Sequence, residues 1–275
     1  MRLYRLLIPI LAIILAILLL STPGFTAGKQ ITIKGSTTVL PIAQAAAEVF
    51  MDKNPAARIS VQGGGSGVGI TSLIERTCDI ADASRKIKDE EIAKAKARGV
   101  IVNEIPIAMD GIAMIVHPSN KLSALTRRQI KDIYTGKVSD WTELGVGKGK
   151  IVVLSRDTSS GTYEAFEALT LHKEKVRTNA LINASNQAIA TTVANTPGAI
   201  GYVGHGYLSR KIKAVSVDGI TCTRENILSG KYPLSRSLYM YTNAKPAGEV
   251  KAFIDFVLGR EGKQIIEEEG FVGLR

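Results

Sequence analysis

The chain has 275 residues, 45% of them apolar and 22% charged, and its formal net charge at pH 7 is +10. That length allows two units of about 100–150 residues with their own cores, and two cysteines are too few for a disulfide-based scaffold. The basic residues are spread along the sequence and there is a single tryptophan. This pattern argues against nucleic acid as a partner and favours a solvated basic surface that attracts small anions.

Residues 1–27 predict a signal peptide for export. Residues 1–5 carry two arginines, Leu6 to Leu20 is almost wholly apolar, and Ser21 to Ala27 is small and polar. The apolar run is short for a membrane span. We expect cleavage after Ala27 and a periplasmic protein, with an uncleaved anchor as the alternative. No cysteine lies near the signal, so a lipid anchor is not expected.

The mature chain begins with a strand, a hydroxyl-rich turn and a helix. Residues 29–34 alternate like a strand, Gly35-Ser36-Thr37-Thr38 forms the turn, and apolar spacing predicts a helix over 39–52. A second strand at 58–61 runs into the glycine-rich stretch 62–69 and a helix over 70–76. That stretch matches no nucleotide-binding motif, and Ser66 is not in a hydrolase nucleophile motif because position 68 is valine.

A third strand is expected at 79–83 and ends in Ser84-Arg85, before a helix over 89–98 and a strand at 100–107. Asp110 follows in an apolar run, where a carboxylate is either paired or at a strand end; a solvent-facing position is the alternative. A helix is predicted over 125–134, and Trp141 is expected in the core.

The stretch from Arg156 to Tyr163 predicts an anion site. It lies between a strand at 151–154 and a helix over 164–171, so backbone N–H groups are free where the helix begins. The hydroxyls of Ser160 and Thr162 and the planar guanidinium of Arg156 suit a tetrahedral oxyanion. The alternative is that Ser159 or Ser160 only caps the helix.

The rest of the chain continues an α/β pattern with mostly parallel strands. Helices are expected over 173–181, 185–195, 250–258 and 264–269, and strands at 199–203, 214–217 and 238–242. Four turns that follow strands are rich in Ser, Thr or Gly, and ligands gather at the carboxyl ends of strands in such sheets. We therefore expect one shared anion site built from the turns at 35–38, 63–67, 84–85 and 156–162.

Five ordered motifs spread over the mature chain resemble the phosphate-binding protein of the phosphate-specific ABC transporter, the PstS family of the periplasmic substrate-binding superfamily. The motifs are Gly35–Pro41, Gly63–Gly67, Ala83–Arg85, Ser160–Thr162 and Pro197–Tyr202.

The resemblance implies a type II periplasmic-binding-protein fold, in which two α/β lobes enclose a ligand cleft. Lobe 1 would comprise residues 28–109 and 237–275, and lobe 2 residues 110–236, with Asp110 at the hinge. Cys78 and Cys222 would then lie on different lobes, where a disulfide would oppose opening, so free thiols are expected. The implied protein is a monomeric receptor without enzymatic activity, cofactor or metal. It would capture inorganic phosphate by lobe closure and deliver it to an inner-membrane ABC permease with its cytoplasmic ATPase.

The resemblance also assigns binding residues, with one departure. The best-known branch has, where this chain has Ser84, an Asp that accepts the proton of monohydrogen phosphate and so excludes sulfate. The acceptor candidates here are Asp110 and Asp82, and we favour Asp110; the alternative for Asp110 is an ion pair with Arg85 and no ligand contact. The expected binding residues are Ser36, Thr37, Thr38, Ser66, Ser84, Arg85, Asp110, Arg156, Ser160, Gly161 and Thr162.

Two other functions are open at this point. One is a receptor for another oxyanion, sulfate or molybdate, which differs in whether an acceptor carboxylate touches the ligand. The other is an exported phosphatase or other hydrolase. The three histidines, His117, His172 and His205, show no metal-ligand spacing and no pairing with an activated serine, which argues against the hydrolase.

Overall fold

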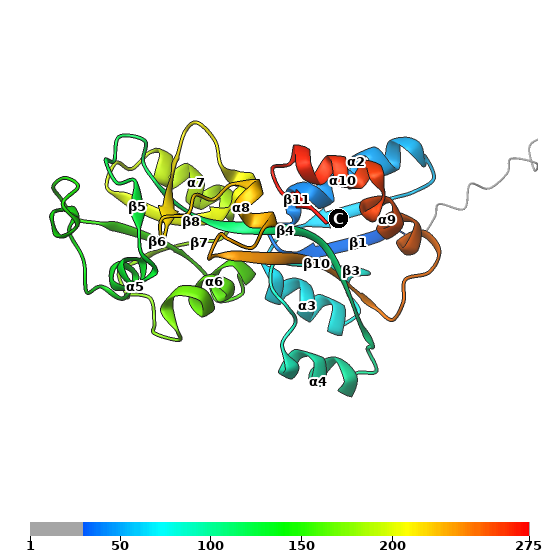
Figure 1. Ribbon diagram of the computed structural model, residues 1–275. Coiled ribbons are helices and arrows are strands. Elements are labelled where there is room, and N and C mark those ends of the chain that lie inside the picture. The colour runs from blue at the N-terminus through cyan, green and yellow to red at the C-terminus, as the bar shows by residue number, and fades with distance from the viewer. Residues whose placement is uncertain (1–29, 275) are drawn as a thin grey trace, which may run out of the picture.

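The structure is a computed structural model that describes residues 30–274, so the predicted export signal lies outside the described residues. Figure 1 shows two lobes side by side. One lobe combines the beginning and the end of the chain, and the other is built from its middle. Both lobes combine strands and helices, which confirms the predicted α/β class.

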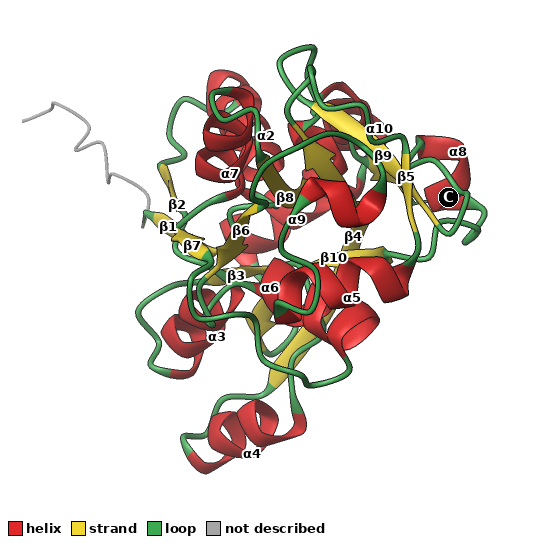
Figure 2. Ribbon diagram, turned by 90° about the vertical axis from the view of Figure 1, so that its left-hand side faces the viewer, coloured by secondary structure: helices red, strands yellow, loops and turns green. Residues whose placement is uncertain are grey.

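The first lobe is a sheet with helices on both faces (Figure 1). Three helices pack around one apolar core on one face, and two pack around a second core on the other. Figure 2 shows that α4 lies at the far end of this lobe. Along the sheet the order is β2 (Ile59–Gln62), β1 (Ile31–Gly35), β3 (Ile80–Ala83), β10 (Ser235–Asn243) and β4 (Val102–Val116). The helices are α2 (Leu40–Lys53), α9 (Gly248–Leu258) and α10 (Arg260–Glu268) on one face, and α3 (Ser66–Ile74) and α4 (Asp89–Ala97) on the other.

The second lobe has its own apolar core, which contains the predicted core residue Trp141, 3% exposed. Its sheet continues from β4 through β8 and β6 to β7, and β9 and β5 extend it beside β4. The strands are β5 (Ala124–Leu125), β6 (Val152–Arg156), β7 (Leu181–Asn183), β8 (Ala199–Gly204) and β9 (Lys213–Val217). The helices are α5 (Arg127–Thr135), α6 (Gly161–Phe166), α7 (Asn186–Ala194) and α8 (Arg224–Leu228).

Strand β4 passes from one lobe into the other. Its residues up to Gly111 pair with β10, whereas those from Ile112 onward pair with β8 and β9. The change of partner lies two residues beyond the boundary expected at 109/110. The division of the chain at 110 and 237 stays a prediction. The short strand β11 (Val272–Gly273) returns the chain end to β4 at Met109.

Two expectations about the elements are wrong. The strand pairs that involve β10 or β4 are antiparallel, because these two strands carry the chain between the lobes in opposite directions. The helix expected over 173–181 is absent: α6 ends in a π-helical turn, Glu167–Leu171, and His172 and Lys173 adopt positive φ angles of 50° and 71°. That left-handed backbone terminates the helix.

The two cysteines are free, as expected from the lobe division that the resemblance implies, and both are buried. Cys78 lies in the core beneath α3 and α4, and Cys222 lies in the core of the second lobe. Burial raises the pKa of the Cys78 thiol to about 12, so this thiol stays protonated and unreactive near neutral pH.

Candidate functional site

The hydroxyl-rich turns of the two lobes contact each other where the lobes meet. Thr38 Oγ1 lies 2.9 Å from Thr162 Oγ1, although the two residues are 124 positions apart. Gly161 also lies against the first lobe. A Cβ atom added at this position would lie 2.2 Å from Ser66 Oγ and 2.9 Å from Ser84 Oγ. All four predicted turns therefore take part in one cluster. We call it the hydroxyl cluster; its contacts across the lobes involve Thr38, Ser66, Ser84, Gly161 and Thr162.

The turn after β1 is fixed by contacts with β3. Ser36 N donates to Asp82 O at 2.8 Å, and only glycine fits at position 35, where a Cβ would lie 2.1 Å from the same oxygen. Ser36 Oγ accepts from Thr38 N at 3.1 Å. Pro41 lies in the first turn of α2, where its missing N–H is not needed. The hydroxyl-bearing residues 36–38 are thereby held at the beginning of α2.

Ser66 and Ser84 form a second pair in the first lobe. Ser66 is the first residue of α3, and its Oγ accepts from Ser84 N at 3.0 Å and lies 3.4 Å from Ser84 Oγ. Both side chains are fully buried. The glycines that precede Ser66 let the second lobe approach, because a Cβ on Gly65 would lie 2.7 Å from Ser159 O.

On the second lobe, Ser160 caps α6. Its Oγ accepts from Tyr163 N at 3.3 Å, so this residue does cap the helix. Capping and site membership are compatible, since Ser160 is 1% exposed and the next two residues contact the first lobe.

Arg156 is a buried cation, and one of its guanidinium nitrogens makes no hydrogen bond within the described residues. Its Nε and Nη2 donate to the backbone carbonyls of Asn183 and Ala184, each at 2.9 Å. Its Nη1 is buried and has no hydrogen-bond partner in the described part of the chain. Burial lowers the pKa of the Arg156 guanidinium, and the nearby Asp157 opposes that effect. A positive charge held by carbonyls with a donor to spare is a strong attractor for an anion.

The sequence reading missed Arg236. It lies on β10 directly opposite Asp110 of β4, and its Nε and Nη2 donate to Asp110 Oδ2 at 2.9 and 2.7 Å. The same Nη2 lies 3.2 Å from Thr38 Oγ1 and 3.1 Å from Thr162 Oγ1. Asp110 is thus paired inside the fold, but with Arg236 and not with Arg85. Burial lowers the pKa of the Arg236 guanidinium, and Asp110 opposes that effect.

Asn186 is the second residue that sequence reasoning missed. It is fully buried at the beginning of α7, and its Nδ2 donates to Thr37 Oγ1 at 3.1 Å and Thr38 Oγ1 at 3.0 Å. Its signal was available, because Ser185 and Asn186 follow β7 in the same strand, polar turn and helix order as the four predicted turns. Arg236 gave a weaker signal, a lone cation at the start of an apolar strand.

Arg85 is engaged away from the hydroxyl cluster. Its two Nη atoms donate to the carboxylate of Glu91 at 2.8 and 2.7 Å, and its Nε forms an ion pair with Glu164 of α6. Lys88 also pairs with Glu164, at 3.0 Å. Arg85, Lys88, Glu91 and Glu164 therefore form an ion-pair cluster that connects the first lobe to the second.

Asp82, the other candidate acceptor, is 1% exposed. Its Oδ1 has no hydrogen-bond partner in the described residues, and burial raises the pKa of this carboxyl well above its usual range. A raised pKa favours the protonated form of Asp82, which offers an O–H donor and a neutral carbonyl oxygen in place of a charged acceptor.

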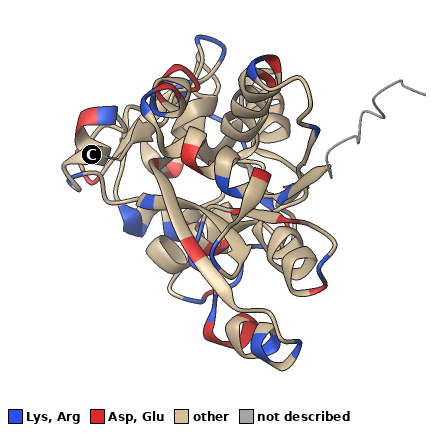
Figure 3. Cartoon of the chain, turned by 90° about the vertical axis from the view of Figure 1, so that its right-hand side faces the viewer, with Lys and Arg blue, Asp and Glu red and all other residues tan. Residues whose placement is uncertain are grey.

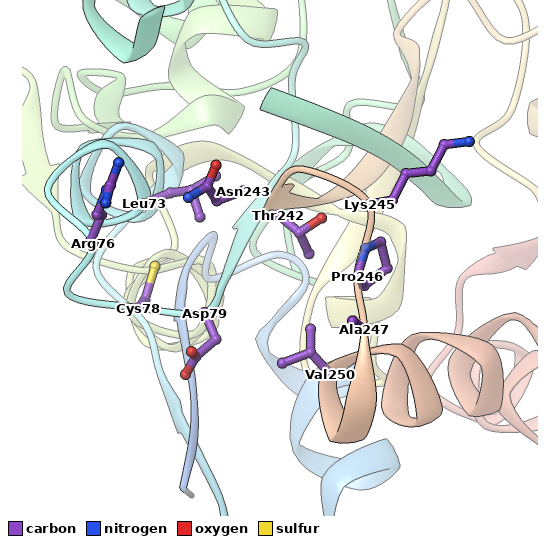
Figure 4. Close-up of a pocket in the computed structure, with 10 residues that line it drawn as sticks. All are labelled: Leu73, Arg76, Cys78, Asp79, Thr242, Asn243, Lys245, Pro246, Ala247 and Val250. Carbon is purple, nitrogen blue, oxygen red and sulfur yellow. The ribbon is translucent and has the colours of Figure 1, made fainter. Parts of the chain in front are cut away.

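A pocket of about 360 Å³ lies elsewhere on the first lobe, at the ends of β3 and β10 that are farther from the hydroxyl cluster (Figure 4). It opens where β3 begins and β10 ends, and it shares no residue with the hydroxyl cluster. Its lining combines apolar side chains with Arg76, Asp79 and Lys245. Asp79 is committed there to the backbone, since its Oδ2 accepts from Thr32 N at 2.9 Å.

Three further observations concern charge, metal ligands and helix hydropathy in the described residues. Figure 3 shows Lys and Arg interspersed with Asp and Glu over one side of the molecule. Within residues 30–274 there is no group of three or more His, Cys, Asp or Glu side chains placed to hold a metal ion. Over the same residues, every helix is too short or too polar to cross a membrane.

Comparison with known proteins gives consistent results. Residues 21–261 match the PBP superfamily domain. The phosphate-binding protein PstS of Bacillus subtilis is 33% identical over 248 residues, which cover 90% of this chain and 81% of that protein. A putative phosphate ABC transporter substrate-binding protein from Clostridium perfringens, solved with bound phosphate, is 38% identical with a TM-score of 0.84, covering 90% of this chain and all of that one. An ABC-type phosphate transport receptor from Vibrio cholerae is 32% identical with a TM-score of 0.73, covering 89% of this chain and all of that one.

The ion-pair cluster predicts a measurable contribution to lobe contact. We expect Glu164→Gln to lower the hydrogen-exchange protection of the Gly67 amide, which donates to Ser159 O across the lobes at 2.9 Å. The expected loss is about two- to fivefold, or roughly 0.5–1 kcal/mol, because Lys88 is partly exposed and screened by solvent. The difference should shrink at high salt.

A matched control is Asp255→Asn, which removes an exposed ion pair with Lys251 on α9. Gly67 exchange that is unchanged in Glu164→Gln, or changed equally in both variants, would contradict a role for the ion-pair cluster.

Proposed function

The chain belongs to the PstS family of phosphate-binding proteins, and on that premise we propose that it captures inorganic phosphate between its lobes and delivers it to an ABC transporter permease. As a binding protein of this family it is a receptor and not an enzyme. Its fold is the type II periplasmic-binding-protein fold.

The observation that carries the proposal is Arg156. The residue is 2% exposed, two carbonyls hold its guanidinium, and Nη1 has no hydrogen-bond partner among the described residues; along the chain it stands four positions before Ser160 of the hydroxyl cluster. A phosphate oxygen that accepts from Nη1 would satisfy that buried donor and gain a charge-assisted hydrogen bond. The surrounding hydroxyls and helix starts supply neutral donors for the other oxygens. The proposed ligand set is Ser36, Thr37, Thr38, Ser66, Ser84, Arg156, Ser160, Gly161 and Thr162.

Arg85 and Asp110 receive supporting roles in this proposal. Arg85 acts on lobe closure, because its guanidinium is already paired with Glu91 and Glu164. Asp110 holds Arg236 and remains our candidate for the proton acceptor. Its Oδ1 accepts one bond, from His205 N at 2.9 Å, and a carboxylate oxygen has a second lone pair.

The setting of this receptor is outside the cytoplasm, and we propose the periplasm, after removal of the signal at residues 1–27. Its partner would be the inner-membrane permease with its cytoplasmic ATPase, and it would act as a monomer. The contacts that cross between the lobes, such as Thr38 with Thr162, would form on closure and break on release.

Another oxyanion remains the second candidate, because hydroxyls and an arginine alone bind sulfate as well as phosphate. The observation that favours it is that Asp110 is largely committed to Arg236 and His205. An acceptor that faces a fully deprotonated sulfate would repel it, whereas it would bind the proton of monohydrogen phosphate.

We expect Arg156→Ala to weaken phosphate binding at least about a hundredfold, or roughly 3 kcal/mol, because the variant loses the buried cationic donor. Isothermal titration calorimetry measures the change. Arg127→Ala removes the same charge from an exposed ion pair with Asp218 and should leave affinity unchanged. Undiminished phosphate affinity in Arg156→Ala would sink the site assignment.

The selectivity for phosphate over sulfate identifies which carboxylate accepts the ligand proton. Competition among phosphate, arsenate, sulfate and molybdate on the wild type should show binding of phosphate and arsenate only. We expect Asp110→Asn to admit sulfate and to raise its affinity relative to phosphate about tenfold or more, whereas Asp82→Asn should leave the ratio unchanged. Sulfate bound tightly by the wild type would favour the other-oxyanion receptor instead. Sulfate admitted by Asp82→Asn alone would transfer the acceptor role to Asp82.

A further inference from the structure

The motif Pro197–Tyr202 is the one sequence motif that supplies no residue to the proposed ligand set. It runs into β8, which lies beside β6, the strand that ends at Arg156. The pairing of these two strands stops early: Val152 and Val153 pair with β8, whereas the next three residues of β6 pair with β7 on the other side. Beyond Val153, the buried end of β6 therefore needs other hydrogen-bond partners on its β8 side.

The Tyr202 hydroxyl is such a partner. A backbone N–H has a single proton, and that of Arg156 is directed at Tyr202 Oη, 3.1 Å away. The Oγ atom of Ser155, the preceding residue, lies 2.9 Å from the same oxygen. All three residues are at most 2% exposed, so the amide has no water as an alternative partner. Tyr202 thus holds the backbone of Arg156 at the end of β6.

The ring of Tyr202 is held in turn by the helix that follows the ligand turn. It stacks on Phe166 of α6, with the ring centroids 4.1 Å apart and the ring planes inclined by 12°. Tyr134 of α5 packs beside it, with its ring centroid 5.7 Å away. Because Tyr202 is fully buried, this packing restricts where its hydroxyl can lie. One side chain therefore contacts both the strand before the turn at 156–162 and the helix after it.

Arg156 is in this way anchored at both ends of its side chain. Its backbone amide donates to Tyr202, and its Nε and Nη2 donate to Asn183 O and Ala184 O. A free arginine side chain has many rotamers, and a receptor that must fix them when the ligand arrives binds that ligand more weakly. With both ends anchored, Nη1, which has no partner among the described residues, is placed beforehand.

We propose that Tyr202 is a positioning residue, whose hydroxyl holds the Arg156 backbone so that Nη1 is in place before the anion binds. This inference rests on the proposed phosphate-binding function. Tyr202 acts through Arg156 and needs no contact with phosphate. Burial raises the pKa of the Tyr202 phenol above its usual value, so the hydroxyl stays neutral at physiological pH.

The test is the phosphate affinity of Tyr202→Phe, measured by isothermal titration calorimetry. The substitution keeps the ring that stacks on Phe166 and removes only the hydroxyl. We expect affinity to fall about five- to tenfold, because an amide without its partner lets Arg156 leave the position that suits the anion. Hydrogen exchange of the Arg156 amide in the phosphate-free variant should be faster than in the wild type.

The matched control is Tyr134→Phe. Tyr134 belongs to the same aromatic group, is fully buried, and donates through its hydroxyl to Leu154 O on the same strand at 3.2 Å. This variant loses an equivalent buried hydrogen bond without touching the Arg156 amide, so its phosphate affinity should stay within about twofold of the wild type. Thermal unfolding compares the stability of the two variants. A loss of affinity of the same size in both would overturn the proposal, because weakened packing alone would explain it.

A double-mutant cycle separates action through Arg156 from a direct contact with phosphate. In the Arg156→Ala background, Tyr202→Phe should change affinity less than about twofold, because the side chain that Tyr202 positions is gone. The same loss in both backgrounds would refute a role through Arg156, and so would unchanged affinity in Tyr202→Phe alone. Failure of the wild type to bind phosphate would instead refute the proposed function.

Discussion

The ion pair between Asp110 and Arg236 supports the whole arrangement of the two lobes. Asp110 lies on the strand that crosses between the lobes, one residue before its pairing with β10 ends, and Arg236 is its direct neighbour on β10. From there the guanidinium reaches Thr38 of the first lobe and Thr162 of the second. Removing one partner of a buried pair typically costs about 3–5 kcal/mol, because the other charge is left without solvent or counter-charge. The facing turns of both lobes thus contact this buried ion pair.

The two buried arginines illustrate how the partner of a side chain determines its role. Arg236 is paired with a buried carboxylate, which neutralises much of its charge, and its Nη2 also contacts Thr38 and Thr162. Arg156 is held by carbonyl oxygens, which carry no charge, and its one acidic neighbour in the described residues is the partly exposed Asp157, at 3.8 Å from Nη2. An incoming anion would therefore meet the weakly paired charge of Arg156 and the threonine hydroxyls that Arg236 contacts.

The sequence was sufficient for the α/β class and for the meeting of the four turns, because these depend on local patterns and on the rule that parallel strands present their carboxyl ends at one edge. The binding role of Arg156 stays a prediction. The sequence was insufficient for the Asp110–Arg236 pair. The two residues are 126 positions apart, and their pairing depends on the antiparallel insertion of β10 between β3 and β4. The alternative partner of Asp110, Arg85, follows a strand of the first lobe, but it pairs with Glu91 in the first turn of α4 and with Glu164 of the second lobe. Local spacing could not reveal either competitor.

A crystal structure of the wild-type protein with phosphate tests the central claim most directly. The account predicts one tetrahedral anion between the lobes, within hydrogen-bond distance of Arg156 Nη1 and Thr162 Oγ1, with the Asp110–Arg236 pair intact. Phosphate bound away from Arg156, or an Arg236 that leaves Asp110 to bind the anion, would contradict it.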